Sequence, residues 1–217
     1  AIDSFLHYTS AKRNKTIYKY ISKTLLHYGI LNYNCFIKGD RFMITFRHSA
    51  TADVDAMDKI IKDAVRGLGA QGIPQWQKGY PNRELLVADI ENGIGYVLTD
   101  QDRVVALCAV TFAEEPAYLH ISNGSWLTGD NASYVTIHRM AVDANLRGKG
   151  YASLLFSSVE DLAVQKGMES IRIDTHEQNL SMQKALEKSG FIRCGNITLC
   201  GGPEDGDPRI AYEKLCR

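Results

Sequence analysis

The chain has 217 residues, 45% of them hydrophobic, and its 25 basic side chains balance its 25 acidic ones. This length suits one domain, or one domain with an appended segment. No run approaches the roughly 18 consecutive apolar residues of a membrane span, and Ala1-Ile2-Asp3-Ser4 lacks the order of a signal peptide, so neither a membrane protein nor a secreted one is expected. The five cysteines form no Cys-x-x-Cys pair, which predicts reduced thiols in a cytoplasmic protein without a metal site.

The N-terminal part of the chain is basic. Residues 1–42 hold seven Lys and Arg against two Asp, a net charge of +5, which leaves −5 for the rest. Residues 10–28 follow the spacing of a basic amphipathic helix, and Gly29 suits its C-terminal end. We therefore expect a basic N-terminal helical extension over 1–41 that docks on the main domain or on a second subunit. A nucleic-acid or membrane-surface arm is the alternative.

From residue 43 onward, strand and helix patterns alternate. Met43-Ile44-Thr45-Phe46-Arg47 predicts a strand, and apolar residues at helical spacing over 54–68 predict a helix that Gly67 and Gly69 close. Asn82 suits the N-cap of a second helix, which runs to Glu91. The following patterns predict strands over 94–99 and 104–112, a hairpin turn at 100–103 between them, and a long irregular loop over 116–133.

The next turn, Leu146-Arg147-Gly148-Lys149-Gly150-Tyr151-Ala152, carries the strongest functional signal. It joins a predicted strand at 134–142 to a predicted helix at 151–166. Bare backbone N–H groups at such a helix start bind a phosphate or pyrophosphate. No Gly-x-x-x-x-Gly-Lys-Ser/Thr is present, so this is not a P-loop. The dinucleotide fingerprint is a closer rival, but its third glycine is Ser153 and five residues separate the strand from the first glycine.

The rest of the chain continues the alternation. We expect a strand at 169–175, a helix at 180–189, and strands at 191–199 and 209–216, with a Gly- and Pro-rich loop over 201–208. The helix lies within Asn179-x-x-Met182-x-x-Ala185-Leu186-Glu187-Lys188-Ser189-Gly190-Phe191, a second motif about thirty residues after the glycine turn.

Together the two motifs resemble the GNAT superfamily of N-acetyltransferases. Arg147-x-x-Gly150-x-Ala152 is similar to its R/Q-x-x-G-x-G/A turn, and 179–191 is similar to its Asn-x-x-Ala-x-x-Leu-Tyr-Glu-Lys-x-Gly-Phe motif. The resemblance covers roughly 42–217, so we expect the extension at 1–41 and a GNAT-like domain at 42–217. It implies an α/β (α+β) fold, with a mixed, largely antiparallel sheet of six to seven strands flanked by helices. Strands four and five of that sheet are splayed.

The resemblance also implies where acetyl-CoA binds. The turn would hold the pyrophosphate through Arg147, Gly148, Lys149, Gly150, Tyr151 and Ala152. The pantetheine arm would pair with Met140 and Val142 like an added strand. Asn179 would bind the amide groups of the coenzyme, although asparagine there also suits a plain helix N-cap. The family often has a tyrosine, the acid for the departing thiolate, where this chain has Leu186.

Candidate catalytic and acceptor residues flank the same strands. A general base must remove a proton from the amine, and histidine titrates near neutral pH. His138 resembles the histidine of arylalkylamine acetyltransferases; the alternative is a hydrogen-bonded core histidine. His176 and Glu177 would bind the amine or relay its proton, unless they form a solvated strand end. Trp76 and Tyr80 are candidates to line the acceptor pocket, or else to pack in the core.

The sequence therefore predicts an acetyl-CoA-dependent N-acetyltransferase in which a primary amine attacks the thioester directly, without a metal. The acceptor would be a small amine or a peptide N-terminus. We expect neither membrane nor nucleic-acid partners, and a homodimer is compatible with the chain. Two other functions stay open: a non-catalytic acyl-CoA-binding sensor, which the missing tyrosine favours, and a nicotinamide-dinucleotide enzyme.

Overall fold

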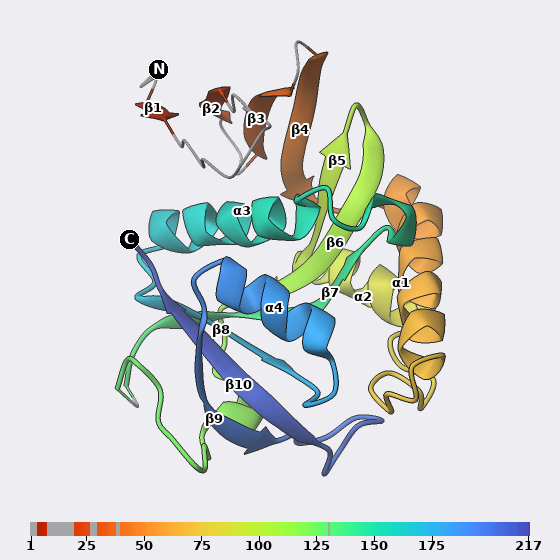
Figure 1. Ribbon diagram of the computed structural model, residues 1–217, viewed down its shortest axis with the longest axis vertical. Coiled ribbons are helices and arrows are strands. Elements are labelled where there is room, and N and C mark those ends of the chain that lie inside the picture. Colours follow the sequence, from red (N-terminus) through yellow and green to blue (C-terminus); the bar gives the residue numbers. More distant parts are fainter. Residues whose placement is uncertain (1–3, 8–19, 27–29, 38–39, 130) are drawn as a thin grey trace, which may run out of the picture.

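A computed structural model describes residues 4–7, 20–26, 30–37, 40–129 and 131–217. They form one mixed sheet with helices packed on it (Figure 1). The strands are β1 (Ser4–His7), β2 (Tyr20–Leu26), β3 (Ile30–Ile37), β4 (Asp40–His48), β5 (Gly95–Asp100), β6 (Arg103–Thr111), β7 (Tyr134–Val142), β8 (Ser170–Thr175), β9 (Ile192–Thr198) and β10 (Pro208–Leu215). The helices are α1 (Val54–Gly69), α2 (Arg83–Glu91), α3 (Tyr151–Gln165) and α4 (Leu180–Lys188), with 3-10 turns η1 (Thr51–Asp53), η2 (Pro116–Tyr118) and η3 (Ala144–Leu146).

One pair of neighbouring strands, β7 and β8, is parallel. The strand order is β1-β2-β3-β4-β5-β6-β7-β8-β10-β9, and every pair of neighbouring strands in the described residues except β7–β8 is antiparallel. Strands β7 and β8 pair only from Tyr134–Ser170 to Thr136–Arg172 and then separate. They are the fourth and fifth strands counted from β4. The predicted mixed, largely antiparallel sheet with a splay between these strands is confirmed.

Helices cover both faces of the sheet, and the alternation of side chains along each strand explains how. Tyr96 and Leu98 of β5 point into the core under α3 and α4, whereas Val97 between them points into the core under α1 and α2. Helix α3 buries Leu155, Phe156 and Val159 in the first core, and helix α1 buries Met57, Ile60 and Ile61 in the second. Within the described part of the chain, no helix has the length and apolarity that crossing a membrane requires.

Local signals placed most elements from residue 43 onward within one or two residues of their observed bounds. Asn82 caps α2 as predicted, its side chain accepting a hydrogen bond from the Leu85 amide at 3.0 Å. The β5–β6 hairpin turns through Gln101 and Asp102, which both have positive φ, the geometry that two-residue hairpins prefer.

The predicted helix over 10–28 is wrong in the part that the structure describes. Residues Tyr20–Leu26 form strand β2, which pairs with β1 and β3. This segment contains Tyr20, Ile21 and Thr24, aromatic and β-branched residues that favour strands, and pairing with two neighbouring strands stabilises the extended backbone. The rest of the predicted helix, 10–19 and 27–28, lies outside the described residues. Strand β4 crosses the predicted boundary between 41 and 42, and the division into two parts remains a prediction.

Candidate active site

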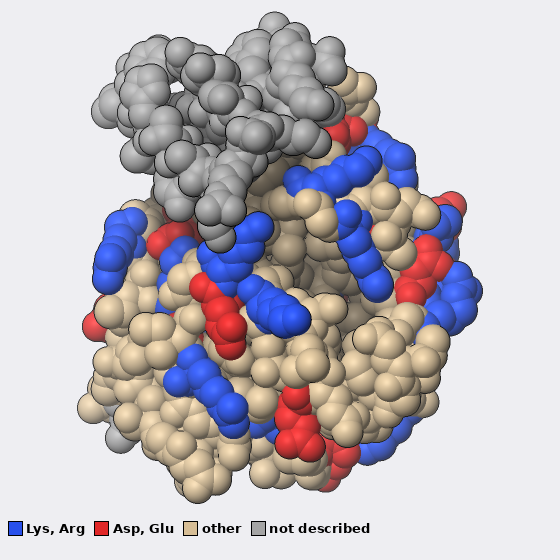
Figure 2. Space-filling view, viewed as in Figure 1, with Lys and Arg blue, Asp and Glu red and all other residues tan. Residues whose placement is uncertain are grey.

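The separation of β7 from β8 opens a pocket of about 500 Å³. Its wall is built from α1, the α1–α2 loop, β7, the glycine turn, β8, α4 and the β9–β10 loop. The hollow is visible on the face shown in Figure 2, bordered by Lys and Arg side chains. The basic lining residues near its mouth are Arg147, Lys184 and Lys188. A partly apolar pocket with a cationic mouth suits a ligand whose charged end is anionic.

The glycine turn leaves its backbone open to a ligand. Gly148 and Gly150 have φ values of 77° and 90°, in the left-handed region that favours glycine, and Gly150 is the N-cap of α3. A Cβ atom at either position would meet no heavy atom within 4 Å. The turn before it is held by Asp143, which accepts from the Asn145 amide at 2.9 Å and pairs with Arg103 at 2.5 Å. The start of α3 therefore presents N–H groups on an uncrowded surface, as an anion site requires.

A β-bulge shapes the strand on the other side of the pocket. Leu107 of β6 pairs with Ala141 and Ala109 pairs with His138, so Arg139 and Met140 together oppose one residue of β6. Arg139 takes the positive φ of 52° that this requires, and its guanidinium binds both carboxylate oxygens of Asp89, at 2.8 and 2.9 Å. Beyond Thr136 the edge of β7 that faces β8 pairs with none of the described strands, and Met140 and Val142 line the pocket there.

His138 lies half-buried in the same wall, beside a carboxylate. Its Nε2 is 3.3 Å from Glu115 Oε2 and 3.4 Å from Thr111 Oγ1. The hydrogen bond from His138 is the largest effect that lowers the pKa of Glu115. Because an ionised carboxylate only accepts, it assigns the proton of neutral His138 to Nε2 and leaves the lone pair on Nδ1. His138 is thus hydrogen-bonded, as a core histidine would be, and also borders the cavity.

The inner end of the pocket holds buried polar groups. Burial raises the pKa of Asp174, whose carboxylate accepts a hydrogen bond from the Tyr118 hydroxyl at 2.8 Å. Arg209 lies 2.9 Å from Glu204, and both are buried. Trp76 and Tyr80 also line the pocket and at the same time pack in the core under α1 and α2, so their role as an acceptor wall stays a prediction. The fold therefore brings Asp174 of β8, Arg209 of β10 and Glu204 of the β9–β10 loop into the same pocket wall as the two aromatic side chains.

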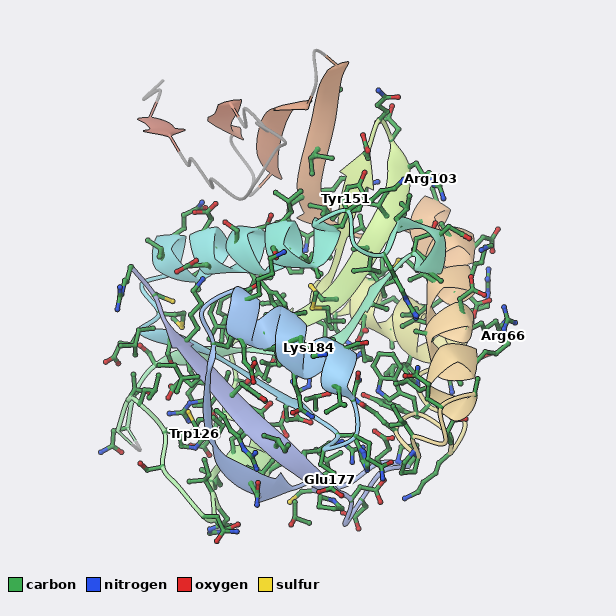
Figure 3. The ribbon with its side chains drawn as sticks, viewed as in Figure 1. Arg66, Arg103, Trp126, Tyr151, Glu177 and Lys184 are labelled. Atoms are coloured by element: carbon green, nitrogen blue, oxygen red, sulfur yellow. The ribbon has the colours of Figure 1, made fainter. Side chains whose placement is uncertain are left out.

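Some of the other predicted site residues line the pocket, and others do not. Arg147, Tyr151, Ala152 and Asn179 line the pocket, together with the residues already described. Asn179 caps α4 through Oδ1, which accepts from the Met182 amide at 3.2 Å, and its Nδ2 donates to Gln75 at 3.0 Å. Lys149, His176 and Glu177 are outside the pocket lining. Glu177 is exposed and lies far from Tyr151 in Figure 3, while buried His176 accepts from the Gln178 amide at 3.2 Å.

Three polar residues of this region have no signal in the sequence: Glu115, Glu204 and Arg209. Each belongs to a loop or a strand end and has a partner that is distant in the chain, His138 for Glu115, Trp76 for Glu204 and Asp174 for Arg209, so no local motif marks it. Within the described residues, no group of three or more His, Cys, Asp and Glu side chains is arranged to hold a metal ion.

The model of the Acetyltransferase (GNAT) family matches residues 61–191, which contain the glycine turn, β7, β8 and most of the pocket wall. The chain belongs to the GNAT family of acetyltransferases. No curated protein matches it.

Solved structures agree with this family. A GNAT acetyltransferase from Streptococcus agalactiae is 32% identical, with a TM-score of 0.71 over 84% of this chain and 98% of that one. A GNAT acetyltransferase from Listeria monocytogenes is 17% identical, with a TM-score of 0.59 over 84% and 99%. The ribosomal-protein-S18-alanine N-acetyltransferase of Escherichia coli is 14% identical, with a TM-score of 0.53 over 80% and 94%. The last two share the fold. Membership identifies this chain as an acyl-transfer protein.

Proposed function

We propose that this protein transfers the acetyl group of acetyl-CoA to a primary amine, with His138 as the general base. One observation carries the proposal: the splayed strands form a pocket with an open glycine turn at one side and a carboxylate-bound histidine in its wall. An anion site and a proton acceptor in one cavity are the two elements that this reaction needs.

The residues present fit the donor. Gly148 and Gly150 leave open space where any larger side chain would crowd a pyrophosphate, and the N-terminus of α3 adds its N–H groups. The unpartnered edge of β7 at Met140 and Val142 would take the pantetheine arm as an added strand. Arg147, Tyr151, Ala152 and Asn179 would complete the binding site. Acetyl-CoA supplies the thioester carbonyl that the amine attacks.

His138 would make the amine reactive. An ammonium ion has no lone pair, so a base must take its proton before the nitrogen bonds to the acetyl carbon. Nδ1 of His138 is the free base in the tautomer that Glu115 imposes. When Nδ1 accepts the proton, the Glu115 carboxylate faces an imidazolium and stabilises it. Glu115 would thus act as a positioning residue.

The thiolate that leaves would take its proton from water. The family often places a tyrosine on α4 for this step, but this chain has Leu186, which is completely buried in the core and has no proton to give. Protonation by water is compatible with turnover because a thiolate near neutral pH is a stable leaving group.

Trp76 and Tyr80 would form the acceptor wall. The acceptor is a small amine or a peptide N-terminus, as the name of the E. coli relative illustrates for ribosomal protein S18. The proposal gives Lys149, His176 and Glu177 no role, because they lie outside the pocket lining.

An acetyl-transfer screen tests the proposal. Acetyl-CoA is offered with a panel of amines and short peptides, and thiol release is measured beside CoA binding. We expect CoA to bind and at least one amine to release thiol. Binding without release by any acceptor would identify the sensor that Leu186 favours. Protection of the fold against heat by NAD but not by CoA would identify a dinucleotide enzyme instead.

A further inference from the structure

Two loops that are far apart in the sequence close the inner end of the pocket. The Trp76 amide donates to Glu204 Oε1 at 2.6 Å, and Lys78 Nζ pairs with Asp207 Oδ1 at 2.8 Å. These contacts join the α1–α2 loop to the β9–β10 loop. Gln75, next to Trp76, also accepts from Asn179 at 3.0 Å. The α1–α2 loop is therefore held on both sides, with a conformation that includes a positive φ of 67° at Trp76.

This closure limits the size of an acceptor. Gln75, Trp76, Glu204 and Arg209 are all less than 10% exposed, although they line a cavity. The volume of about 500 Å³ must hold the acetyl end of the donor as well as the acceptor. The donor would occupy the mouth beside the glycine turn. A peptide acceptor that left the cavity on this side would have to pass between the two joined loops and would break both contacts.

Arg209 indicates what the acceptor carries at its other end. This side chain is 2% exposed, and its Nη1 donates to the Pro208 carbonyl at 2.9 Å. Its Nη2 is ion-paired with Glu204 Oε2 at 2.9 Å, but it makes no hydrogen bond within the part of the chain that the structure describes. A buried donor on a charged group is costly to leave without an acceptor. An oxygen of the acceptor molecule would satisfy it from inside the cavity.

A carboxyl group also lies at the reacting end. Glu115 Oε2 is 3.3 Å from His138 Nε2, whereas Asp174 is 3.8 Å from Arg209 Nε, at the other end. An ammonium group near Glu115 and His138, with an oxygen at Arg209, describes a molecule that is cationic at one end and accepts hydrogen bonds at the other.

We propose that the acceptor is a small free amine with a carboxyl-derived oxygen, such as an amino acid or its amide, enclosed between Trp76 and Arg209, and that it is not a protein N-terminus. This inference rests on the proposed function.

The first experiment compares three sets of acceptors with the unmodified protein. They are free amino acids and their amides, the matching amines without the carboxyl group, and hexapeptides that begin with the same residues. For the best acceptor we expect kcat/KM at least about tenfold above both its matched amine and its hexapeptide. A hexapeptide that reacts as well as the free form would overturn the size limit, and a matched amine that reacts as well would overturn the role of the oxygen.

Two variants test separately whether Arg209 binds an oxygen of the acceptor and whether the joined loops exclude peptides. Arg209→Lys keeps the charge but removes the guanidinium, so KM for the amino acid or amide should rise about tenfold more than KM for the matched amine. Lys78→Ala removes one contact between the loops and should raise the activity on hexapeptides relative to free amines. Lys59→Ala is its control, because Lys59 also pairs with an aspartate, at 2.9 Å, but on the exposed face of α1. Equal effects of Lys78→Ala and Lys59→Ala would contradict closure by the loops.

Failure of the proposed function has a different signature. If CoA binds but no free amine, amide or peptide releases thiol, the transferase reaction itself is absent and the acceptor assignment falls with it. If peptides alone react, the transferase stands and only the small-amine inference is wrong.

Discussion

His138 is the residue on which the proposed chemistry depends. His138→Ala should lower kcat/KM by roughly 10² to 10⁴ if His138 is the general base, and CoA affinity should change little because the expected coenzyme contacts are mostly backbone. Initial rates from pH 5 to 9 and CoA titrations measure both, with exposed His120→Ala as control. An unchanged rate with an unchanged acidic limb would assign the proton transfer to another group or to water. Loss of folding would identify a structural histidine.

Glu115 gives a separate pH test. Because the hydrogen bond from His138 lowers the pKa of Glu115, this carboxyl is an anion near neutral pH, and the proposed function makes protonation of the imidazole the cause of the acidic limb of the rate profile. Glu115→Gln removes the anion that stabilises the imidazolium, so the limb should move down by about one pH unit or more. The measurement is the pH dependence of kcat/KM. A profile that coincides with that of the unmodified protein would mean that Glu115 only anchors its loop.

Gly150 tests the coenzyme site. With a φ of 90° and open space beside it, this glycine leaves room for an anion. Gly150→Asp should weaken CoA binding at least about tenfold, because a like charge beside the pyrophosphate costs more than about 1.4 kcal/mol. Gly167→Asp is a matched control, since Gly167 also has a positive φ, 71°, and lies outside the pocket lining. Unchanged CoA affinity in a folded Gly150→Asp protein would remove the turn from the proposed site.

At the scale of elements, a buried ion pair holds the long segment between β6 and β7 against the sheet. The Arg172 guanidinium lies 4.2 Å from the Trp126 ring centre and 4.0 Å from that of Tyr134. Arg172 Nε is 3.0 Å from Glu213 Oε1, and the two side chains are 2% and 0% exposed. The Glu213 carboxylate also accepts from the hydroxyls of Thr128 and Ser170. This cluster fixes the loop that brings Glu115 and Tyr118 to the pocket.

Glu213→Gln should therefore reduce the free energy of unfolding by about 3 kcal/mol, because it leaves the Arg172 charge buried without its anionic partner. Urea denaturation followed by circular dichroism measures the change. The exposed pair Lys59–Asp63 is the comparison, and Lys59→Ala should cost less than about 1 kcal/mol. Equal losses for the two variants would show that the buried cluster adds nothing beyond a surface pair.

The sequence predicts those elements whose signals are local. Strand β7 has the bounds expected from its apolar run, and the glycine turn and the cap at Asn179 lie where their residue types require. The bulge at Arg139 has no such signal, since the residue that takes the positive φ is neither glycine nor asparagine. The contacts of Glu115, Glu204 and Arg209 depend on loops that meet only after the sheet has formed. Sequence patterns therefore locate the donor side of the pocket better than its acceptor side.

At the scale of the molecule, the first three strands extend the sheet beyond β4. Removing residues 1–39 would leave β4 as an exposed edge, because β3 is its only pairing partner on that side among the described strands. The truncated protein should melt at a lower temperature or change its oligomeric state, while its CoA affinity stays the same. Calorimetry, light scattering and CoA titration measure these properties. Nucleic-acid binding with a steep salt dependence by the full chain alone would instead favour the basic arm.

The sparse pairing of β7 with β8 has a consequence for how the molecule behaves as a body. Among the described residues, only three pairs join the strands from β1 to β7 with those from β8 to β10, so the sheet consists of two parts that meet along a short contact. Acetyl-CoA bound between the separated ends of β7 and β8 would form hydrogen bonds where the two strands do not pair. It would thereby connect the two parts of the sheet. Backbone amides of both parts would then exchange their hydrogens more slowly, and the two parts would unfold as one cooperative unit. While it is bound, the donor would therefore also act as a structural part of the sheet.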